Sequence, residues 1–391
     1  MRLPLIPLLI AIVVNILVDS YIYKALKRRF KSRAPAQIQL WSAVAMFVLI
    51  LTALFLPRTA SNGALLAVMW MIYIYISVYF AKYVFVIIDL IALIPRLFNR
   101  KRLRWLSVVA CVAGVGIFAV LFWASLINRF RLDVNEVEIG IEGYRIAQIS
   151  DLHVGTYGND TAFVSSLADR LNALDADLIV FTGDIVNSRA AELVPHAGPL
   201  SRLSAPDGVL SILGNHDYGD YASWPDAAAK RENIELLKSL QEKMGWRLLL
   251  NETETLRRGQ DSIIVIGVEN IGDPPFPVYG SLSKAYPQLS DSVVKILLTH
   301  NPAHWADSIA SRPGINIPLS LAGHTHAMQI EIFGWSPAKY RYHTWGGLYT
   351  DDDNSHKLYV NIGTGTVGLP ARVGATPEIT LFTLKNAKSL H

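Results

Sequence analysis

Small polar clusters whose side chains are typical of metal sites recur along the second half of the chain. Together they supply three carboxylates, one amide and five imidazoles. They are Asp151-Leu152-His153, Gly183-Asp184, Gly214-Asn215-His216-Asp217, His300 and Gly323-His324-Thr325-His326. Mixed oxygen and imidazole ligands suit Mn, Fe or Zn, and paired divalent ions serve in-line phosphoryl displacement. The pattern therefore predicts a dinuclear metal site that hydrolyses phosphate esters.

Taken one at a time, these clusters are ambiguous. A glycine before an aspartate, as in Gly183-Asp184, often marks a simple turn, and His216-Asp217 also fits a hydrogen-bonded surface pair. The repetition favours a site, because ligand-type residues directly follow an apolar run at each of the five places. We therefore expect one shared site and not five unrelated surface features.

The apolar runs before the clusters are the elements that must position them. These runs span residues 144–150, 178–181, 209–213, 294–298 and 317–322. We expect strands there, alternating with helices over Thr161–Leu174 and Asp226–Lys243, as in an α/β domain. Ligands of open sheets bind beyond the carboxyl ends of the strands. The clusters should therefore converge at one edge of the sheet.

The order and residue types of the clusters resemble the calcineurin-like metallophosphoesterase superfamily over about residues 142–386. The resemblance implies a four-layer αββα sandwich with two divalent metal ions. It implies that the first ion is bound by Asp151, His153, Asp184 and His326, and that the second is bound by Asp184, Asn215, His300 and His324. His216 would protonate the leaving oxygen, and Asp217 would orient the ring of His216. The reaction implied is attack of a metal-bound hydroxide on a phosphodiester, pyrophosphate or phosphomonoester.

The C-terminal motifs are similar to a membrane-anchored bacterial branch of YkuE- and YaeI-like phosphodiesterases. They include Gly363-Thr364-Gly365 and Pro370-Ala371-Arg372. The branch pattern Gly-His-Thr-His-Gly-Gly-Gln appears here with Ala327 and Met328 in place of two glycines. Arg372 fits a phosphate contact, because a guanidinium pairs well with that group, but an ordinary surface arginine remains the alternative. For His304 we expect a structural role.

Four long apolar runs occupy the first 130 residues, near 3–23, 40–56, 64–93 and 105–127. Each approaches or exceeds the ~20 residues that a helix needs to cross a bilayer. One such run fits a buried core helix, but four in succession indicate membrane spans. The third run carries Lys82 and Asp89, which are costly at mid-membrane, and the sequence assigns them no role.

The charges between these runs predict the orientation of the chain. Six basic residues lie between the first two runs and five between the last two, whereas the middle connection has only Arg58. Loops rich in Lys and Arg face the cytoplasm, so residues after 130 should lie outside it. Because these charges closely flank apolar runs, we expect no nucleic-acid partner. The single cysteine, Cys111, allows no intrachain disulfide.

Together these patterns predict a multi-pass protein of the cytoplasmic membrane with an extracytoplasmic catalytic domain. We expect a transmembrane domain over residues 1–128, a linker and first strand over 129–141, and a metallophosphoesterase domain over 142–391. Its partners should be the lipid bilayer and a phosphoester, with a lipid-linked phosphate suggested by the anchor. A protein phosphatase, a broad-specificity phosphatase and a non-catalytic membrane sensor or scaffold are the alternatives. The sequence leaves the metal, the exact substrate and the oligomeric state open.

Overall fold

The computed structural model describes residues 5–56, 62–139, 144–258, 261–274, 276–288, 293–310, 312, 314–352 and 354–384. The chain forms two compact units, residues 1–125 and residues 126–391. The expected boundary between linker and catalytic domain, at residues 141 and 142, lies outside the described residues.

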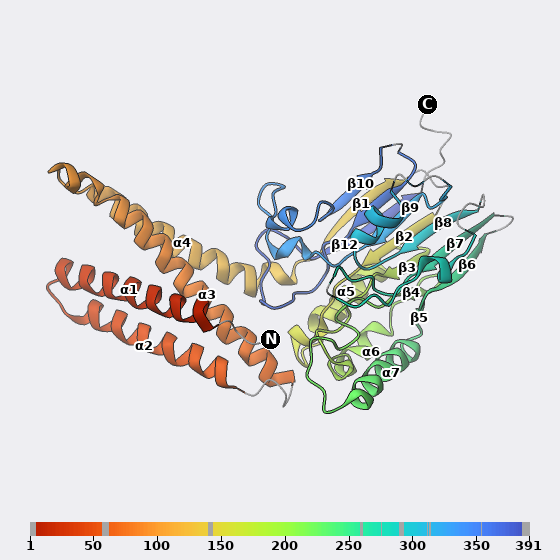
Figure 1. The fold of residues 1–391 in the computed structure, drawn as a ribbon, viewed down its shortest axis with the longest axis horizontal. Coiled ribbons are helices and arrows are strands. Elements are labelled where there is room, and N and C mark those ends of the chain that lie inside the picture. The colour runs from red at the N-terminus through yellow and green to blue at the C-terminus, as the bar shows by residue number, and fades with distance from the viewer. Residues whose placement is uncertain are drawn as a thin grey trace. The chain divides into compact units, whose positions relative to one another are not determined.

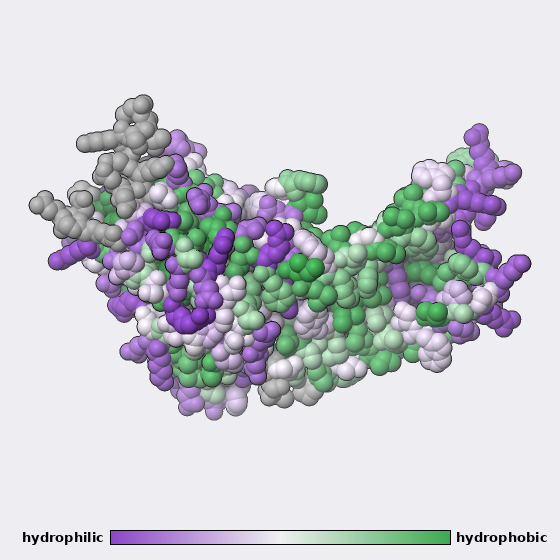
Figure 2. All heavy atoms as spheres, turned by 180° about the vertical axis from the view of Figure 1, so that it is seen from behind, coloured by the Kyte–Doolittle hydropathy of each residue, from purple (hydrophilic) through white to green (hydrophobic). Residues whose placement is uncertain are grey.

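In its described residues the first unit has four long helices, which form because these segments are apolar and almost free of helix breakers. The helices are α1 (Leu5–Arg29), α2 (Ala34–Phe55), α3 (Asn62–Ile91) and α4 (Arg104–Leu126), with a 3-10 turn, η1 (Ile94–Phe98), after α3. Within the described residues, three stretches are long and apolar enough to cross a membrane: Ala34–Phe55, Gly63–Phe98 and Arg104–Phe130. Figure 2 shows the apolar surface that these helices present. The prediction of an all-helical membrane domain is confirmed.

The charged residues inside the helical unit are paired with one another. Lys82 on α3 lies 2.7 Å from Asp19 on α1. Asp89 accepts a hydrogen bond from Tyr21 at 2.6 Å and is ion-paired with Arg102. Pairing of this kind offsets the cost of placing a charge at membrane depth.

The second unit is built on two mixed six-stranded sheets (Figure 1). The first sheet has the strand order β1-β12-β2-β3-β4-β5, and β2 to β5 run parallel. Its strands are β1 (Asp133–Ile139), β2 (Tyr144–Ile149), β3 (Leu178–Phe181), β4 (Val209–Ser211), β5 (Arg247–Leu248) and β12 (Glu378–Leu384). The short parallel strands β2 and β3 are almost wholly buried, as expected for a sheet covered on both faces.

The second sheet has the order β10-β11-β9-β8-β7-β6, and β7, β8, β9 and β11 run parallel. Its strands are β6 (Glu252–Arg258), β7 (Asp261–Gly267), β8 (Val294–Leu298), β9 (Leu319–Ala322), β10 (Gly347–Thr350) and β11 (Lys357–Val360). β10 lies within residues 332–356, a stretch rich in aromatic and polar residues. Its few residues lack a sustained apolar alternation, so the pairing with β11 decides its structure.

Helices cover the outer face of each sheet, which gives the predicted four-layer sandwich. A core between the sheets joins residues such as Ile146 and Val180 of the first sheet to Val265 and Leu298 of the second. Outside the first sheet pack α5 (Ala162–Asn172), α6 (Ala197–Leu200) and α7 (Ala227–Lys243). Outside the second sheet pack α8 (Leu282–Ala285) and α9 (Ala303–Ser308). Buried strands held from both faces place the loops at their ends accurately.

Candidate metal centre

The five polar clusters converge at one edge of the sandwich. β2, β3 and β4 are parallel neighbours in the first sheet, and β8 and β9 are parallel neighbours in the second. Their carboxyl ends therefore lie together, and the loops leaving them carry the ligand-type residues. Strand order thereby brings His153 within 3.1 Å of His326, although the two are 173 positions apart.

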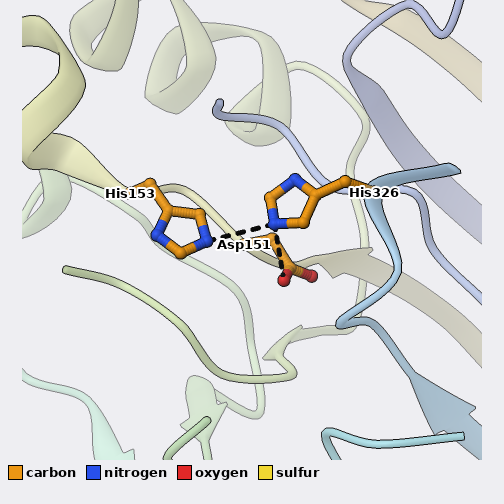
Figure 3. A group of neighbouring side chains, drawn as sticks. All are labelled: Asp151, His153 and His326. Atoms are coloured by element: carbon orange, nitrogen blue, oxygen red, sulfur yellow. Dashed lines mark hydrogen bonds and ion pairs between the residues drawn. The ribbon is translucent and has the colours of Figure 1, made fainter. Parts of the chain in front are cut away.

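One group of possible ligands consists of Asp151, His153 and His326 (Figure 3). The Nε2 atom of His326 lies 3.1 Å from Nε2 of His153 and 3.2 Å from Oδ1 of Asp151. All three side chains are buried. Their possible ligand atoms all lie within 4.8 Å of one another, as in a metal-binding site.

A second group consists of Asp184, His300 and His324, with Asn215 beside it. The Nε2 atom of His300 lies 3.1 Å from Oδ2 of Asp184 and 3.0 Å from Oδ1 of Asn215. The Nδ1 atom of His324 lies 2.9 Å from the same Asn215 oxygen. Oδ2 of Asp184 is also 3.7 Å from Nε2 of His153. Asp184 therefore contacts both groups.

The hydrogen bonds around the second group turn its polar atoms toward one another. The Nδ1–H of His300 donates to the backbone carbonyl of Thr182 at 2.8 Å, so its Nε2 faces Asp184 and Asn215. The amide nitrogen of Asn215 donates to Tyr221 at 2.9 Å, so its Oδ1 faces His300. This donor set of oxygen and imidazole suits a divalent ion.

Burial sets the protonation of the histidines in the centre. Burial and the neighbouring His216 hold the pKa of His153 well below its usual value. Burial and His300 lower the pKa of His324 to about 4. For His300 burial acts in the same direction, but the carboxylate of Asp184 outweighs it and raises that pKa to about 9. His153 and His324 are thus neutral at pH 7, the form in which imidazole binds metals.

The backbone around the centre adopts conformations that L-residues usually avoid. Five of the ligand-type residues have positive φ: Asp151 (53°), His153 (45°), Asp184 (61°), His324 (78°) and His326 (51°). Left-handed backbone at non-glycine residues stores strain and concentrates at functional sites. Glycine is required at Gly214, where a Cβ would lie 2.2 Å from Oδ1 of Asp184. Ala327 and Met328, which replace two glycines of the branch pattern, keep φ values of 50° and 46°.

His216 borders the centre but is held differently from the expectation. Its ring packs edge-on against His153 and stacks on Tyr221. Its Nδ1–H donates to the backbone carbonyl of Asn187 at 2.7 Å. Asp217 does not orient this ring, because its carboxylate accepts four backbone N–H groups instead. These donors are the amides of Asp184, Ile185, Val186 and Gly214, at 2.8–3.2 Å.

Arg372 lies beneath the centre and not in a position to contact substrate. Its side chain is 0% exposed. It donates to the backbone carbonyls of Ile362, Gly365 and Ala375 at 2.7–3.1 Å, and its Nη2 lies 3.3 Å from Nδ1 of His326. The prediction of a phosphate contact is wrong, because a buried guanidinium must satisfy its donors inside the protein.

Three residues near the centre carried no recognisable sequence signal. Tyr342 lies 3.2 Å from Nε2 of His324 through its hydroxyl. Tyr221 contacts both Asn215 and His216. The contribution of Asn187 is a backbone carbonyl, which every residue type supplies. For Tyr342 the length of its loop was the only available hint.

The fold and this centre define a class of protein: a membrane-anchored metallophosphoesterase. The family model described as "Calcineurin-like phosphoesterase" matches residues 144–328, and the one described as "Probable Calcineurin-like phosphoesterase, transmembrane domain" matches residues 1–129. The chain belongs to the calcineurin-like phosphoesterase family and is a hydrolase of phosphate esters.

Proteins similar to this chain occur in both bacteria and animals. The chain is 33% identical over 258 residues to the Bacillus subtilis "Uncharacterized metallophosphoesterase YkuE", which covers 63% of this chain and 81% of that protein. It is 30% identical over 269 residues to the Bos taurus "Transmembrane protein with metallophosphoesterase domain", covering 67% of this chain and 57% of the bovine protein. It is 26% identical over 311 residues to the Chlamydia trachomatis "UDP-2,3-diacylglucosamine pyrophosphatase LpxG", covering 66% of this chain and 88% of that protein.

Proposed function

We propose that residues 142–391 hydrolyse a phosphoester with the help of two divalent metal ions. Asp151, His153, Asp184 and His326 would hold one ion, and Asp184, Asn215, His300 and His324 would hold the other. The observation that carries this proposal is the position of Asp184, whose Oδ2 lies 3.1 Å from His300 and 3.7 Å from His153. A carboxylate between two cations offsets their mutual repulsion.

The metal ions, His216 and Asp217 would each contribute differently to the reaction. Bound divalent ions would supply Lewis acidity and lower the pKa of a coordinated water. His216, with Nδ1 committed to Asn187, has Nε2 left to donate a proton to the leaving oxygen. General acid help of this kind is worth about 10²–10⁴-fold in rate. Backbone amides around Asp217 fix the loop that carries Asp184.

We propose a lipid-linked phosphate as the substrate, such as a pyrophosphate or a phosphodiester. Membrane-spanning helices in the same chain support this, because they tether the catalytic domain to a lipid bilayer. The name of the Chlamydia trachomatis relative, a UDP-2,3-diacylglucosamine pyrophosphatase, points in the same direction.

We further propose that the catalytic domain lies outside the cytoplasm. The α1–α2 and α3–α4 connections lie at the same end of the helical unit (Figure 1), and most of the basic residues of this unit lie in them or in the adjoining helix ends. Basic loops face the cytoplasm, and α4 leads away from that end into the catalytic domain. Alkaline phosphatase and fluorescent-protein fusions at the C-terminus test this. We expect the alkaline phosphatase fusion to be active and the fluorescent-protein fusion to lack fluorescence. An inactive phosphatase fusion with a fluorescent second fusion would contradict the extracytoplasmic location.

The reaction is tested on the purified full chain in nanodiscs. Elemental analysis should find about two divalent ions per chain, the number that defines a two-metal site, and Asp184→Asn should lose both ions and activity. Asp169→Asn, at an exposed carboxylate on α5, is the matched control. Lipid-linked pyrophosphates, diesters, soluble monoesters and phosphopeptides are then compared. Hydrolysis of soluble esters alone would contradict the proposal of a lipid-linked substrate. Activity of Asp184→Asn equal to that of the wild type would contradict the proposed two-metal reaction.

A further inference from the structure

The loop before β10 displays a phenylalanine in a strained turn. Ile332 and Trp335 exchange two backbone hydrogen bonds, at 2.8 and 3.0 Å, around Phe333 and Gly334. The φ values of Phe333 and Gly334 are 51° and 78°. A two-residue turn with both central φ values positive favours Asn-Gly or Gly-Gly, and positive φ is unusual for a bulky residue. The side chain of Phe333 is nevertheless fully exposed, at 105%.

Other apolar and basic side chains surround this turn. We call residues 332–341 the aromatic tip. Within it Trp335 is 40% exposed and Tyr340 is 77% exposed. The ammonium group of Lys339 lies over the rings of Tyr340, at 5.3 Å, and Trp335, at 5.9 Å. Exposed aromatics interleaved with a cation are typical of segments that lie at a membrane interface.

The aromatic tip is tied to the segment that carries two metal-ligand candidates. Ser336, which is 0% exposed, donates to the carbonyl of Ala327 at 2.6 Å and accepts from the amide of Ala338 at 3.1 Å. Ala327 directly follows His326, and Tyr342, the residue directly after the tip, contacts His324. The exposed rings therefore protrude from a fixed base beside the centre.

We infer that the aromatic tip inserts into the interface of the bilayer that holds the helices of the same chain, and so brings lipid headgroup phosphates to the metal centre. The bilayer is favoured as the occupant because the same chain is anchored in it, and tethering converts a weak surface affinity into high occupancy. The lipid-substrate part of this inference rests on the proposed function. Insertion itself does not.

Site-specific fluorescence tests insertion without any need for activity. Cys111 is the only cysteine, so Cys111→Ser gives a background for Phe333→Cys labelled with the environment-sensitive fluorophore NBD. The control is Glu235→Cys, at a side chain that is 69% exposed on α7. In nanodiscs of phosphatidylglycerol and phosphatidylcholine, we expect the label at 333 to shift to the blue and to be quenched by spin-labelled lipid, and the label at 235 to do neither.

Two results would overturn insertion. An unshifted label at 333 would show that the tip stays in water. A blue shift without quenching by lipid would show that protein, such as a second copy of the chain, covers the tip. Both readings are independent of whether the chain hydrolyses any phosphoester, so they are distinct from failure of the proposed function.

The delivery of substrate is tested with Phe333→Asn. This change removes the ring but leaves an Asn-Gly pair, which the turn favours, so the fold should be kept. We expect the ratio of the rate on bilayer-embedded substrate to the rate on a soluble diester to fall roughly tenfold, because a buried aromatic ring contributes strongly to membrane affinity. An unchanged ratio would overturn the delivery role.

Discussion

The ring of His216 is oriented by the backbone carbonyl of Asn187, which accepts its Nδ1–H at 2.7 Å. A carbonyl can only accept, so this contact places the Nδ1 proton and turns Nε2 away from Asn187. The carboxylate next in sequence, Asp217, accepts from four backbone amides instead. The two neighbours in sequence therefore have separate hydrogen-bond partners.

If His216 protonates the leaving oxygen, His216→Gln should slow substrates in proportion to how much their leaving groups need a proton. We expect a loss of about 10²–10⁴-fold in kcat on alkyl phosphoesters and a much smaller loss on nitrophenyl esters. Steady-state kinetics on matched alkyl and nitrophenyl esters measure the two losses. Equal losses on both would contradict the acid role, and unchanged bound metal would show that the centre is intact.

Asp217→Asn should act on stability and not through the ring of His216. The amide that replaces one carboxylate oxygen would face backbone N–H donors, and a hydrogen bond to a charged group is worth about 1.5–3 kcal/mol. We expect a free energy of unfolding lowered by at least about 2 kcal/mol, measured by thermal and urea unfolding. His216→Gln should leave the unfolding midpoint almost unchanged. Identical behaviour of the two variants would contradict this division.

Arg372 should be required for the folded state of the centre and not for substrate affinity. Arg372→Met would leave three buried carbonyls without their donor, and each buried polar group left unsatisfied costs about 1–3 kcal/mol. We expect a large fall in the unfolding midpoint, with Arg247→Met on the exposed strand β5 as control. In Arg372→Lys, a raised KM with an unchanged midpoint would instead indicate a contact with substrate.

His304 should make the stability of the catalytic domain depend on pH. Burial lowers its pKa to about 4, and its Nδ1 contacts the hydroxyl of Thr299 at 3.0 Å. Because the unfolded chain binds this proton near pH 6.5 and the folded chain does not, stability is complete above pH 6.5 and falls as the pH drops toward 4. The loss is on the order of 3 kcal/mol.

The comparison of wild type with His304→Gln isolates this contribution. The amide keeps a partner for Thr299 but does not titrate. We expect the difference between the two unfolding midpoints to favour wild type most above pH 6.5 and to shrink toward pH 4, as followed by circular dichroism in detergent. A difference that stays constant over this range would show that His304 does not titrate on unfolding.

The sequence by itself determined the types of the candidate ligands and the sheet edge at which they meet. Asp151, Asp184 and His300 each lie within three residues of the end of a buried apolar run, and parallel strands place their carboxyl ends together. The apolar runs near the N-terminus likewise determined the membrane domain, since their length and composition suffice. Both inferences rest on local patterns that can be recognised directly in the sequence.

Only the tertiary structure decided which groups complete the centre. The partner of His216 is a backbone carbonyl 29 positions away, and a carbonyl has no sequence signature. Arg372 looked like a surface phosphate ligand, but the loop of residues 362–375 folds around it and uses its donors. Phe333 lies fully in solvent because a left-handed turn holds it there, and no local sequence pattern indicates that turn. Such contacts depend on how distant loops pack, and that packing is fixed by the whole fold and not by neighbouring residues.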